Sequence, residues 1–110
     1  SKDSVDVIEL VKDFIKKNYN RNLSRSDIAD HVYLNETYVG RIFKKSTGKT
    51  VREYHLECRM KRAAELLEAD EKISSISREL GYNDKRVFLR QFKAYNGCSP
   101  IEYKKKIRKE

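Results

Sequence analysis

The chain has 110 residues, with 25 Lys or Arg against 17 Asp or Glu and a formal net charge of +8. This length allows one compact unit or two very small ones, but not a large enzyme cleft. The excess of basic residues indicates a polyanionic partner. Nucleic acid is the leading candidate, and a membrane surface is the second. No run approaches the ~18 apolar residues of a membrane span and no signal-peptide pattern opens the chain, so we expect a soluble, cytoplasmic protein.

Helices are the only regular structure that the apolar pattern predicts. Apolar residues recur at spacings of three and four, and four Gly and one Pro leave few breakers. The first helix is expected from Asp3 to about Asn18, with one buried stripe. That stripe consists of Val7, Leu10, Val11, Phe14 and Ile15.

Two helices joined by a tight turn are expected next. Ser24 can cap a short helix through Val32, because a serine hydroxyl accepts a hydrogen bond from the first helical turn. After the turn Tyr-Leu-Asn, Asn35 can cap a longer helix that ends at Gly48.

The longest predicted helix runs from Val51 to Ala69 without an internal breaker, and Thr50 and Glu53 form a capping box at its start. It is a plausible connector. As a continuous helix it spans about 28 Å, against about 34 Å for one turn of B-DNA. We therefore expect it to hold two DNA-reading helices in adjacent major-groove segments, about 10 base pairs apart. If the helix centres lie closer than a full turn, either the DNA bends toward the protein or one helix enters its groove only partly.

Three more helices complete the chain. Ser74 can cap a fifth helix that ends at Gly81, and Asn83 or Asp84 can cap a sixth that ends near Gly97. The stretch Ser-Pro-Ile-Glu from residue 99 supplies a capping box for a seventh, with Pro at its first position. The predicted fold is thus all-α, with helix-turn-helix subdomains at 1–49 and 70–110 and a connector at 50–69.

The second half of the chain repeats the first. One set of four residues recurs at an offset of 48: it consists of Ile28, Ala29, Val32 and Asn35, which match Ile76, Ser77, Leu80 and Asn83. A second set recurs at an offset of 49: it consists of Arg41, Phe43, Lys44 and Gly48, which match Arg90, Phe92, Lys93 and Gly97. The second turn therefore has one additional residue. Each copy has a short helix, a turn and a longer basic helix, which is the organisation of a helix-turn-helix unit.

The longer helix of each copy divides into an apolar and a basic face when it is rotated by 100° per residue. In the first copy the apolar face holds Val39, Ile42 and Phe43, and the opposite face Thr37, Gly40, Arg41 and Lys44. In the second copy the apolar face holds Phe88, Phe92 and Tyr95, and the opposite face holds Arg86, Leu89, Arg90 and Lys93. A single basic helix face is usually just solvated. Two basic faces at matching positions of a repeat favour the interpretation that both helices are DNA recognition helices.

DNA contacts follow from these faces. Arg41 and Arg90 are the leading candidates to read guanine, Gly40 leaves room for close approach, and Leu89 can touch a thymine methyl. Phosphate contacts are expected from lysines and from helix N-terminal amides. The expected phosphate contacts are Lys44, Lys45, Lys49, Lys85 and Lys93, with the amides near Ser24 and Ser74.

The second half carries a characteristic set of residues: Arg59, Ala63, Leu66, Leu67, Ile73, Ile76, Gly81, Tyr82, Phe88, Phe92, Lys93, Gly97, Pro100 and Tyr103. This set resembles the signature of AraC/XylS transcriptional regulators. The first half looks like the N-terminal unit of the same family, so the likeness covers about Val7 to Lys105. The stretch "HVYLNETYVGRIFKKSTG" is similar to the YesN-like branch, in which a phosphorylated receiver domain precedes this domain. Two residues depart from the family pattern: Gly40 has no side chain to read with, and Ser77 replaces the usual Ala.

The resemblance implies a bacterial regulator, usually an activator, that binds double-stranded DNA, with a regulatory or receiver domain elsewhere in the full chain. The residues that fall where the family reads bases are Thr37, Gly40, Arg41, Lys85, Arg86, Leu89 and Arg90.

No other chemistry is expected. His31, His55, Cys58 and Cys98 do not close a zinc site, and no catalytic motif is present, so we expect no enzyme activity, no metal and no cofactor. Two alternatives stay open: a nonspecific basic module for RNA or nucleoid DNA, and a protein-interaction domain that contacts RNA polymerase or a membrane surface.

Overall fold

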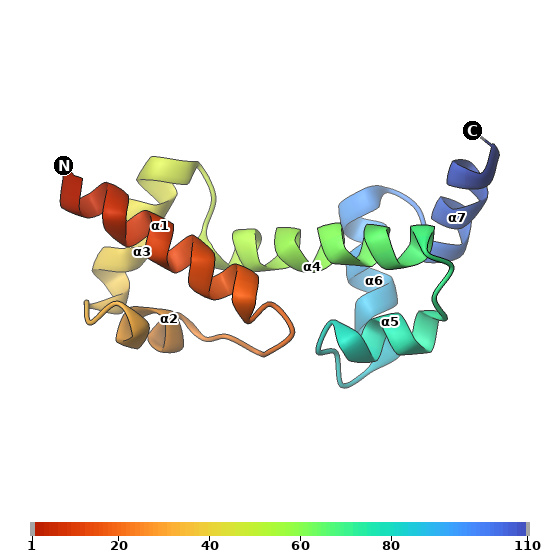
Figure 1. Cartoon of the computed structure of the whole chain (residues 1–110), viewed down its shortest axis with the longest axis horizontal. Coiled ribbons are helices and arrows are strands. Elements are labelled where there is room, and N and C mark those ends of the chain that lie inside the picture. Colours follow the sequence, from red (N-terminus) through yellow and green to blue (C-terminus); the bar gives the residue numbers. More distant parts are fainter. Residues whose placement is uncertain (1, 110) are drawn as a thin grey trace. The chain divides into compact units, whose positions relative to one another are not determined.

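The computed structural model describes residues 2–109, and their side chains from Val5 onward. Over this range the chain forms seven helices and no strand, which confirms the all-α prediction (Figure 1). The helices are α1 Lys2–Lys17, α2 Arg25–His31, α3 Glu36–Thr47, α4 Val51–Glu68, α5 Ile73–Glu79, α6 Lys85–Asn96 and α7 Pro100–Lys109. No helix in this range has the length and apolar character needed to cross a bilayer.

Two compact units share these helices, and the boundary between them falls inside α4, after Cys58. The first unit contains α1, α2, α3 and the first half of α4; the second contains the second half of α4, α5, α6 and α7 (Figure 1). α4 is therefore continuous, as expected, but each half packs in a different unit. The subdomain boundaries at 49 and 69 stay a prediction.

The helix starts are capped largely as predicted, because capping depends on side chains only a few residues apart. Thr50 and Glu53 form the expected box at α4, with both hydrogen bonds at 3.0 Å. Ser99 and Glu102 form the second box at α7, at 2.9 and 3.1 Å. Asn35 caps α3, and Asp84, one of the two residues proposed, caps α6.

One predicted cap is wrong. Ser74 does not cap α5, because the helix starts at Ile73 and its N-cap residue is Lys72, which makes no side-chain cap hydrogen bond. Ile73 is half-buried and Ile76, three residues on, is buried. Burial of this pair on one helical face sets where α5 begins, ahead of the local preference for a serine cap.

The core of the first unit is formed by α1, α2, α3 and the start of α4. Its buried residues are Ile8, Val11, Ile15, Ile28, Ala29, Val39, Phe43 and Val51. The predicted stripe of α1 is wrong at Leu10, which is 52% exposed. Because Ile8, Val11 and Ile15 are the fully buried set, the buried stripe is centred further round the helix, and Leu10 lies outside it.

The core of the second unit is built from the second half of α4 and from α5, α6 and the start of α7. Its buried apolar residues are Met60, Ala63, Leu66, Leu67, Ile76, Leu80, Phe88, Phe92, Cys98 and Pro100. Arg59 and Ser77 are buried beside them. Tyr95 was placed on this apolar side but is 49% exposed, since it lies in the last turn of α6, just before Gly97.

The internal repeat includes residues beyond the helix-turn-helix positions. Phe43 meets Tyr54 edge-on at 5.6 Å between ring centroids, and Phe92 meets Tyr103, 49 residues later, in the same way at 5.6 Å. The two capping boxes are also 49 residues apart. The first half of α4 is therefore the counterpart of α7, so each unit consists of a helix, a helix-turn-helix and a closing helix.

The turn between the paired helices carries the extra residue. Four residues separate α2 from α3 and five separate α5 from α6, which agrees with the shift of offset from 48 to 49. Both turns place a residue in the left-handed backbone region, Tyr33 at φ 57° and Gly81 at φ 92°. A tyrosine adopts this conformation less easily than a glycine.

Candidate nucleic-acid interface

The outward face of α3 is polar and lies opposite a buried face, as predicted. Val39 and Phe43 are buried and Ile42 is half-buried, so they hold the helix against its own unit. Thr37, Arg41 and Lys44 are exposed and Gly40 is half-buried. The helix ends at Gly48, whose φ of 79° allows its N–H to donate to the Lys44 carbonyl at 2.8 Å.

Two features of this face suit close contact with a duplex. A Cβ added at Gly40 would meet nothing within 4 Å, so the surface there is open. The guanidinium of Arg41 lies 5.5 Å from the ring centroid of Tyr38, one helical turn back, and its stem can lie along that ring. Both Arg41 and Tyr38 are exposed, so the guanidinium keeps access to solvent and to a ligand.

The outward face of α6 shows the same division. Phe88 and Phe92 are buried, and Leu89, although on the outward side of the helix, is half-buried. The basic residues of this helix are all exposed. They are Lys85, Arg86, Arg90 and Lys93.

Arg86 differs from the other basic residues because its guanidinium is fixed to the helix N-cap. Its Nη2 donates to Asp84 Oδ2 at 2.9 Å and its Nε donates to Asp84 Oδ1 at 3.2 Å. The side-chain hydrogen bond from Arg86 lowers the pKa of Asp84, and the same contact raises the pKa of Arg86. Sequence reasoning did not identify Asp84 as a partner of Arg86, although an acidic N-cap two residues before an arginine is a readable signal.

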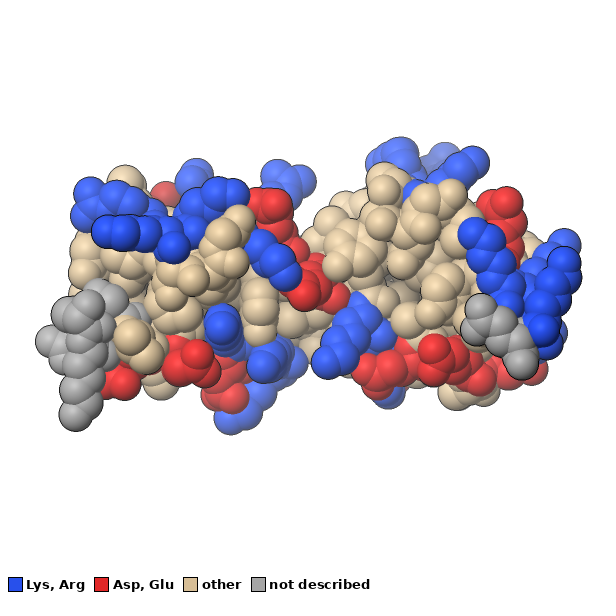
Figure 2. All heavy atoms as spheres, turned by 90° about the horizontal axis from the view of Figure 1, so that it is seen from above, with Lys and Arg blue, Asp and Glu red and all other residues tan. Residues whose placement is uncertain are grey.

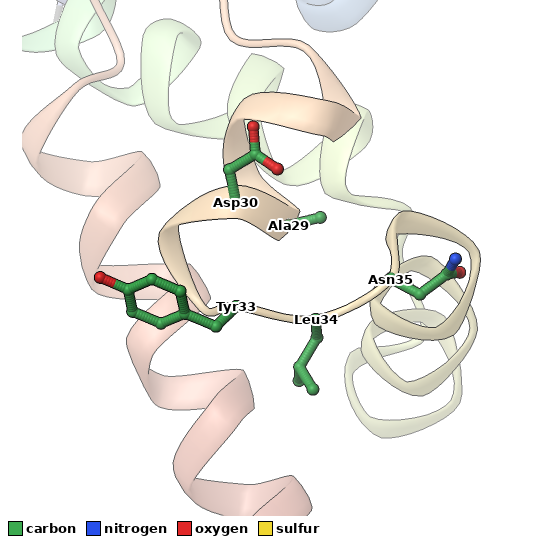
Figure 3. A pocket seen from close by; sticks show the side chains of 5 residues that line it. All are labelled: Ala29, Asp30, Tyr33, Leu34 and Asn35. Carbon is green, nitrogen blue, oxygen red and sulfur yellow. The ribbon is translucent and has the colours of Figure 1, made fainter.

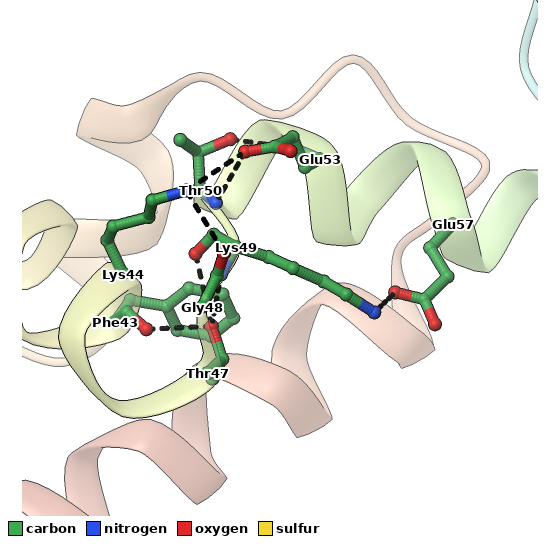
Figure 4. Close-up of polar contacts among 8 residues, drawn as sticks. All are labelled: Phe43, Lys44, Thr47, Gly48, Lys49, Thr50, Glu53 and Glu57. Carbon is green, nitrogen blue, oxygen red and sulfur yellow. Dashed lines mark hydrogen bonds and ion pairs between the residues drawn. The ribbon is translucent and has the colours of Figure 1, made fainter.

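The predicted phosphate-binding lysines fall into two groups. Lys44 and Lys49 have protein partners at the junction of α3 and α4 (Figure 4). Lys44 Nζ donates to the Gly48 carbonyl at 3.0 Å and lies 3.8 Å from a carboxylate oxygen of Glu53, and Lys49 is paired with Glu57. The other group, Lys45, Lys85 and Lys93, is exposed and makes no ion pair among the contacts of residues 5–109.

The two predicted amide sites at helix starts also differ. At α2, Ser24 Oγ accepts the N–H of Asp27 at 3.0 Å, and the Asp27 carboxylate accepts the N–H of Ser24 at 2.9 Å. The backbone hydrogen bond from Ser24 lowers the pKa of Asp27, so a negative charge already occupies this start. Ser74 is exposed in the first turn of α5, which has no side-chain cap.

Charge is unevenly spread over the surface of each unit. Figure 2 shows, on the second unit (right), basic side chains grouped along one edge and at one end, with acidic side chains along the opposite edge and uncharged surface between them. On the first unit (left), a group of basic side chains covers the upper edge, and further basic side chains lie among acidic ones toward the lower edge. A separated basic area is the electrostatic arrangement that attracts phosphates.

A shallow, open hollow lies beside the turn between α2 and α3 (Figure 3). Its lining residues are Ala29, Asp30, Tyr33, Leu34 and Asn35. Asp30 is the one carboxylate in this lining, and the other residues with polar side chains in it are Tyr33 and Asn35.

The two histidines each contact another part of the first unit. The His55 Nε2 lies 2.8 Å from the carbonyl oxygen of Tyr19, and the ring of His31 stacks on Phe14 at 4.1 Å. Cys58 is half-buried and Cys98 is buried, and neither is in a disulfide. Among the described residues, no three His, Cys, Asp or Glu side chains come together in a way that could hold a metal ion.

Comparison with known proteins identifies the family. The model of a helix-turn-helix domain matches residues 28–106, most of the chain. The chain belongs to the AraC-type helix-turn-helix family. This family consists of DNA-binding transcription regulators, and membership confirms the resemblance inferred from the sequence.

Curated relatives are regulators of operons. The chain is 39% identical over 101 residues to the Msm operon regulatory protein of Streptococcus mutans, covering 91% of this chain and 36% of that protein. It is 34% identical over 98 residues to the lactose operon transcription activator of Staphylococcus xylosus, covering 88% of this chain and 35% of the relative. The AraC-type domain thus spans about a third of the length of these relatives.

Solved structures share the fold closely. The C-terminal domain of AraT, a response regulator from Geobacillus stearothermophilus, superposes with a TM-score of 0.87 at 25% identity, covering 91% of this chain and 84% of that one. The C-terminal domain of the response regulator yesN from Fusobacterium nucleatum gives 0.82 at 28% identity, covering 87% and 95%. The DNA-binding domain of AdpA, solved with a target DNA, gives a TM-score of 0.84 at 20% identity and covers 92% of each chain. At this level of identity the comparison shows a shared fold.

Proposed function

We propose that this domain binds a specific double-stranded DNA sequence, with α3 and α6 as the two recognition helices, and so directs a bacterial transcription regulator to its sites. One observation carries the proposal: in each unit the longer helix of a helix-turn-helix buries its phenylalanines and exposes arginine and lysine on the opposite side. A recognition helix needs this division, because one face must dock on the domain while the other enters the major groove.

Base contacts are proposed for the outward residues of the two helices. Arg41 and Arg90 are exposed and carry the fork of donors that pairs with guanine O6 and N7. Gly40 allows close approach, and Leu89 offers an apolar edge for a thymine methyl. The full proposed set is Thr37, Gly40, Arg41, Lys85, Arg86, Leu89 and Arg90.

Phosphate contacts are proposed in an order that reflects the protein partners of each lysine. Lys45, Lys85 and Lys93 come first, because no ion pair among the described contacts competes for them. Lys44 and Lys49 come second, since Glu53 and Glu57 hold them. The amide of Ser74 precedes that of Ser24, where the Asp27 carboxylate repels a phosphate.

Selection of bound duplexes from a random pool, followed by titration at several salt concentrations, tests the proposal. We expect an enriched sequence with two half-sites about one helical turn apart, and binding that weakens steeply with salt. Arg41→Ala and Arg90→Ala should each remove preference at different bases, at about 1 to 3 kcal/mol per contact. A pool with no enriched sequence, or equal weakening on every duplex in both variants, would instead indicate a nonspecific basic module.

The full-length protein is proposed to be a longer cytoplasmic activator in which this domain binds DNA and another domain receives the signal. The relatives are about two and a half times as long as this chain, and one is named a transcription activator. A receiver domain is one candidate, because AraT and yesN are response regulators. RNA polymerase is a candidate second partner, and no enzyme activity or cofactor is proposed.

A further inference from the structure

The N-cap of α6 holds an arginine in a fixed geometry. Asp84 Oδ1 accepts the backbone N–H of Arg86 at 2.9 Å, as an N-cap does. The same carboxylate accepts two hydrogen bonds from the Arg86 side chain, Nε at 3.2 Å and Nη2 at 2.9 Å. Asp84 therefore fixes both the start of the helix and the orientation of the guanidinium.

Counting donors shows what this pairing leaves available. A guanidinium has five N–H groups, and Asp84 uses one on Nε and one on Nη2. The remaining three lie on Nη1 and Nη2, at the end of the side chain away from the carboxylate. Two parallel N–H groups on this end match guanine O6 and N7 in the major groove.

Exposure explains why the pairing matters. Arg86 has 85% of its side chain exposed, so packing does not restrict its rotamers. A free arginine must lose much of its rotamer entropy to form a bidentate contact. The Asp84 carboxylate orders the side chain before DNA arrives, which lowers that cost.

Charge gives the pairing a second consequence. The Asp84 carboxylate offsets the positive charge of Arg86, so the pair contributes little to the attraction of phosphates. Lys85, which lies between Asp84 and Arg86 in the sequence, makes no ion pair with a carboxylate among the described contacts. The pair is therefore suited to reading a base and not to adding general affinity.

The first unit provides a matched comparison within the same chain. Asn35 is the N-cap of α3, 49 residues before Asp84, and its Oδ1 accepts the N–H of Thr37 at 2.9 Å. Thr37 stands 49 residues before Arg86. Asparagine in the first unit and aspartate in the second therefore fill the same capping position. Of the two units, the second is the one in which the N-cap side chain also pairs with an arginine.

We propose that Asp84 is a positioning residue that orients Arg86 to read one guanine in the DNA segment contacted by α6. This inference rests on the proposed function, and it adds a residue that acts through another without touching the base. Asp84→Asn is the diagnostic substitution, because asparagine keeps the cap, as Asn35 does, but removes the charged second oxygen.

The test uses the 110-residue chain and the duplex that it selects from a random pool. Arg86→Ala should locate the base pair, by lowering preference for one guanine roughly 5- to 150-fold. Asp84→Asn should lower preference for the same guanine by about fivefold or more, and replacing that guanine by 7-deazaguanine, which lacks N7, should reduce the effect. The thermal unfolding midpoint of Asp84→Asn and the salt slope of Arg86→Ala should stay close to those of the unaltered chain.

A double-variant comparison completes the test. In the Arg86→Ala background, Asp84→Asn should cause no further loss of base preference, because the residue that it positions is gone. Tighter binding to every duplex by Asp84→Asn, with guanine preference unchanged, would overturn the inference and show that the carboxylate withholds Arg86 from DNA. If the unaltered chain selects no sequence, the proposed function itself fails, which is a separate outcome.

Discussion

The guanidinium of Arg59 lies over the ring of Tyr82, 4.6 Å from its centroid. Arg59 is 7% exposed, on the second half of α4, and Tyr82 lies in the turn before α6. Tyr82 in turn donates a hydrogen bond to Gln91 on α6 and packs against Phe88. This stack links α4 to the turn that precedes α6.

Replacement of Arg59 by methionine should therefore destabilise the second unit. The substitution keeps much of the side-chain length but removes the cation–ring contact, which is worth about 2 kcal/mol when it is desolvated. Urea unfolding combined with amide hydrogen exchange would measure the loss, which should be confined to residues after Cys58. Arg52→Met, at an exposed position on the same helix, is the control and should change stability by less than about 0.5 kcal/mol.

Gly40→Ala should change stability and DNA binding in opposite directions. A Cβ at Gly40 meets nothing within 4 Å, so the alanine should stabilise α3 by about 1 kcal/mol through helix propensity. If the duplex approaches this surface, the added methyl group should weaken binding. Thermal unfolding and titration of the selected duplex would measure the two effects.

Gly48→Ala provides the contrasting control for that prediction. Its φ of 79° is unfavourable for an alanine, so this variant should lose about 1 kcal/mol or more despite the open space around it. Unchanged DNA affinity in Gly40→Ala would argue against close approach at that residue.

Glu53→Gln should strengthen DNA binding by releasing Lys44. Glutamine keeps the capping-box acceptor for the Thr50 N–H but removes the charge 3.8 Å from Lys44 Nζ. If Lys44 then contacts a phosphate, the slope of log affinity against log salt should steepen by up to about 0.9. Glu68→Gln, at an exposed position without an ion pair among the described contacts, should leave the slope unchanged.

Acid should weaken the second unit partly through Asp70. The Lys104 ammonium, at 2.7 Å, and the Arg108 guanidinium, at 2.6 Å, hold the pKa of Asp70 below its ordinary value of 3.8. Because the folded-state pKa is the lower one, the pairing stabilises the unit above about pH 4, and this contribution is lost as pH falls through the folded-state pKa.

Asp70→Asn should therefore reduce the loss of stability between about pH 6 and about pH 3, as measured by urea midpoints. Asparagine suits the φ of 61° at this position, so the backbone should not be disturbed. High salt should shrink the difference between the two chains, since these side chains are exposed. An identical pH profile in the variant would show that the pairs contribute nothing to folding.

The sequence predicted the parts of this structure that depend on neighbouring residues. The boxes of Thr50 with Glu53 and of Ser99 with Glu102, and the αL ends at Gly48 and Gly97, are local features and are confirmed. The fold class and the family followed from the repeat and its motifs.

Burial at the edges of helices was less predictable. Leu10 and Tyr95 have the right spacing, but exposure depends on which neighbouring helices reach them, and periodicity does not contain that information. The start of α5 was misplaced for a similar reason, because buried Ile76 and half-buried Ile73 outweighed Ser74.

The candidate site was predicted as a face but not as a set of contacts. Sequence reasoning placed Lys44 and Arg86 on the outward sides of their helices, where they lie. It did not reveal that Glu53 holds one and Asp84 the other, because such pairings depend on side-chain geometry around a helix end.

The division of α4 between the two units has a practical consequence for cutting the chain apart. The loops at 48–50 and 69–72 flank α4, and cleavage at either one leaves one unit without its share of that helix. A protease that cuts in one of these loops can therefore release only one unit whole, and the other unit, without its share of α4, should be digested further.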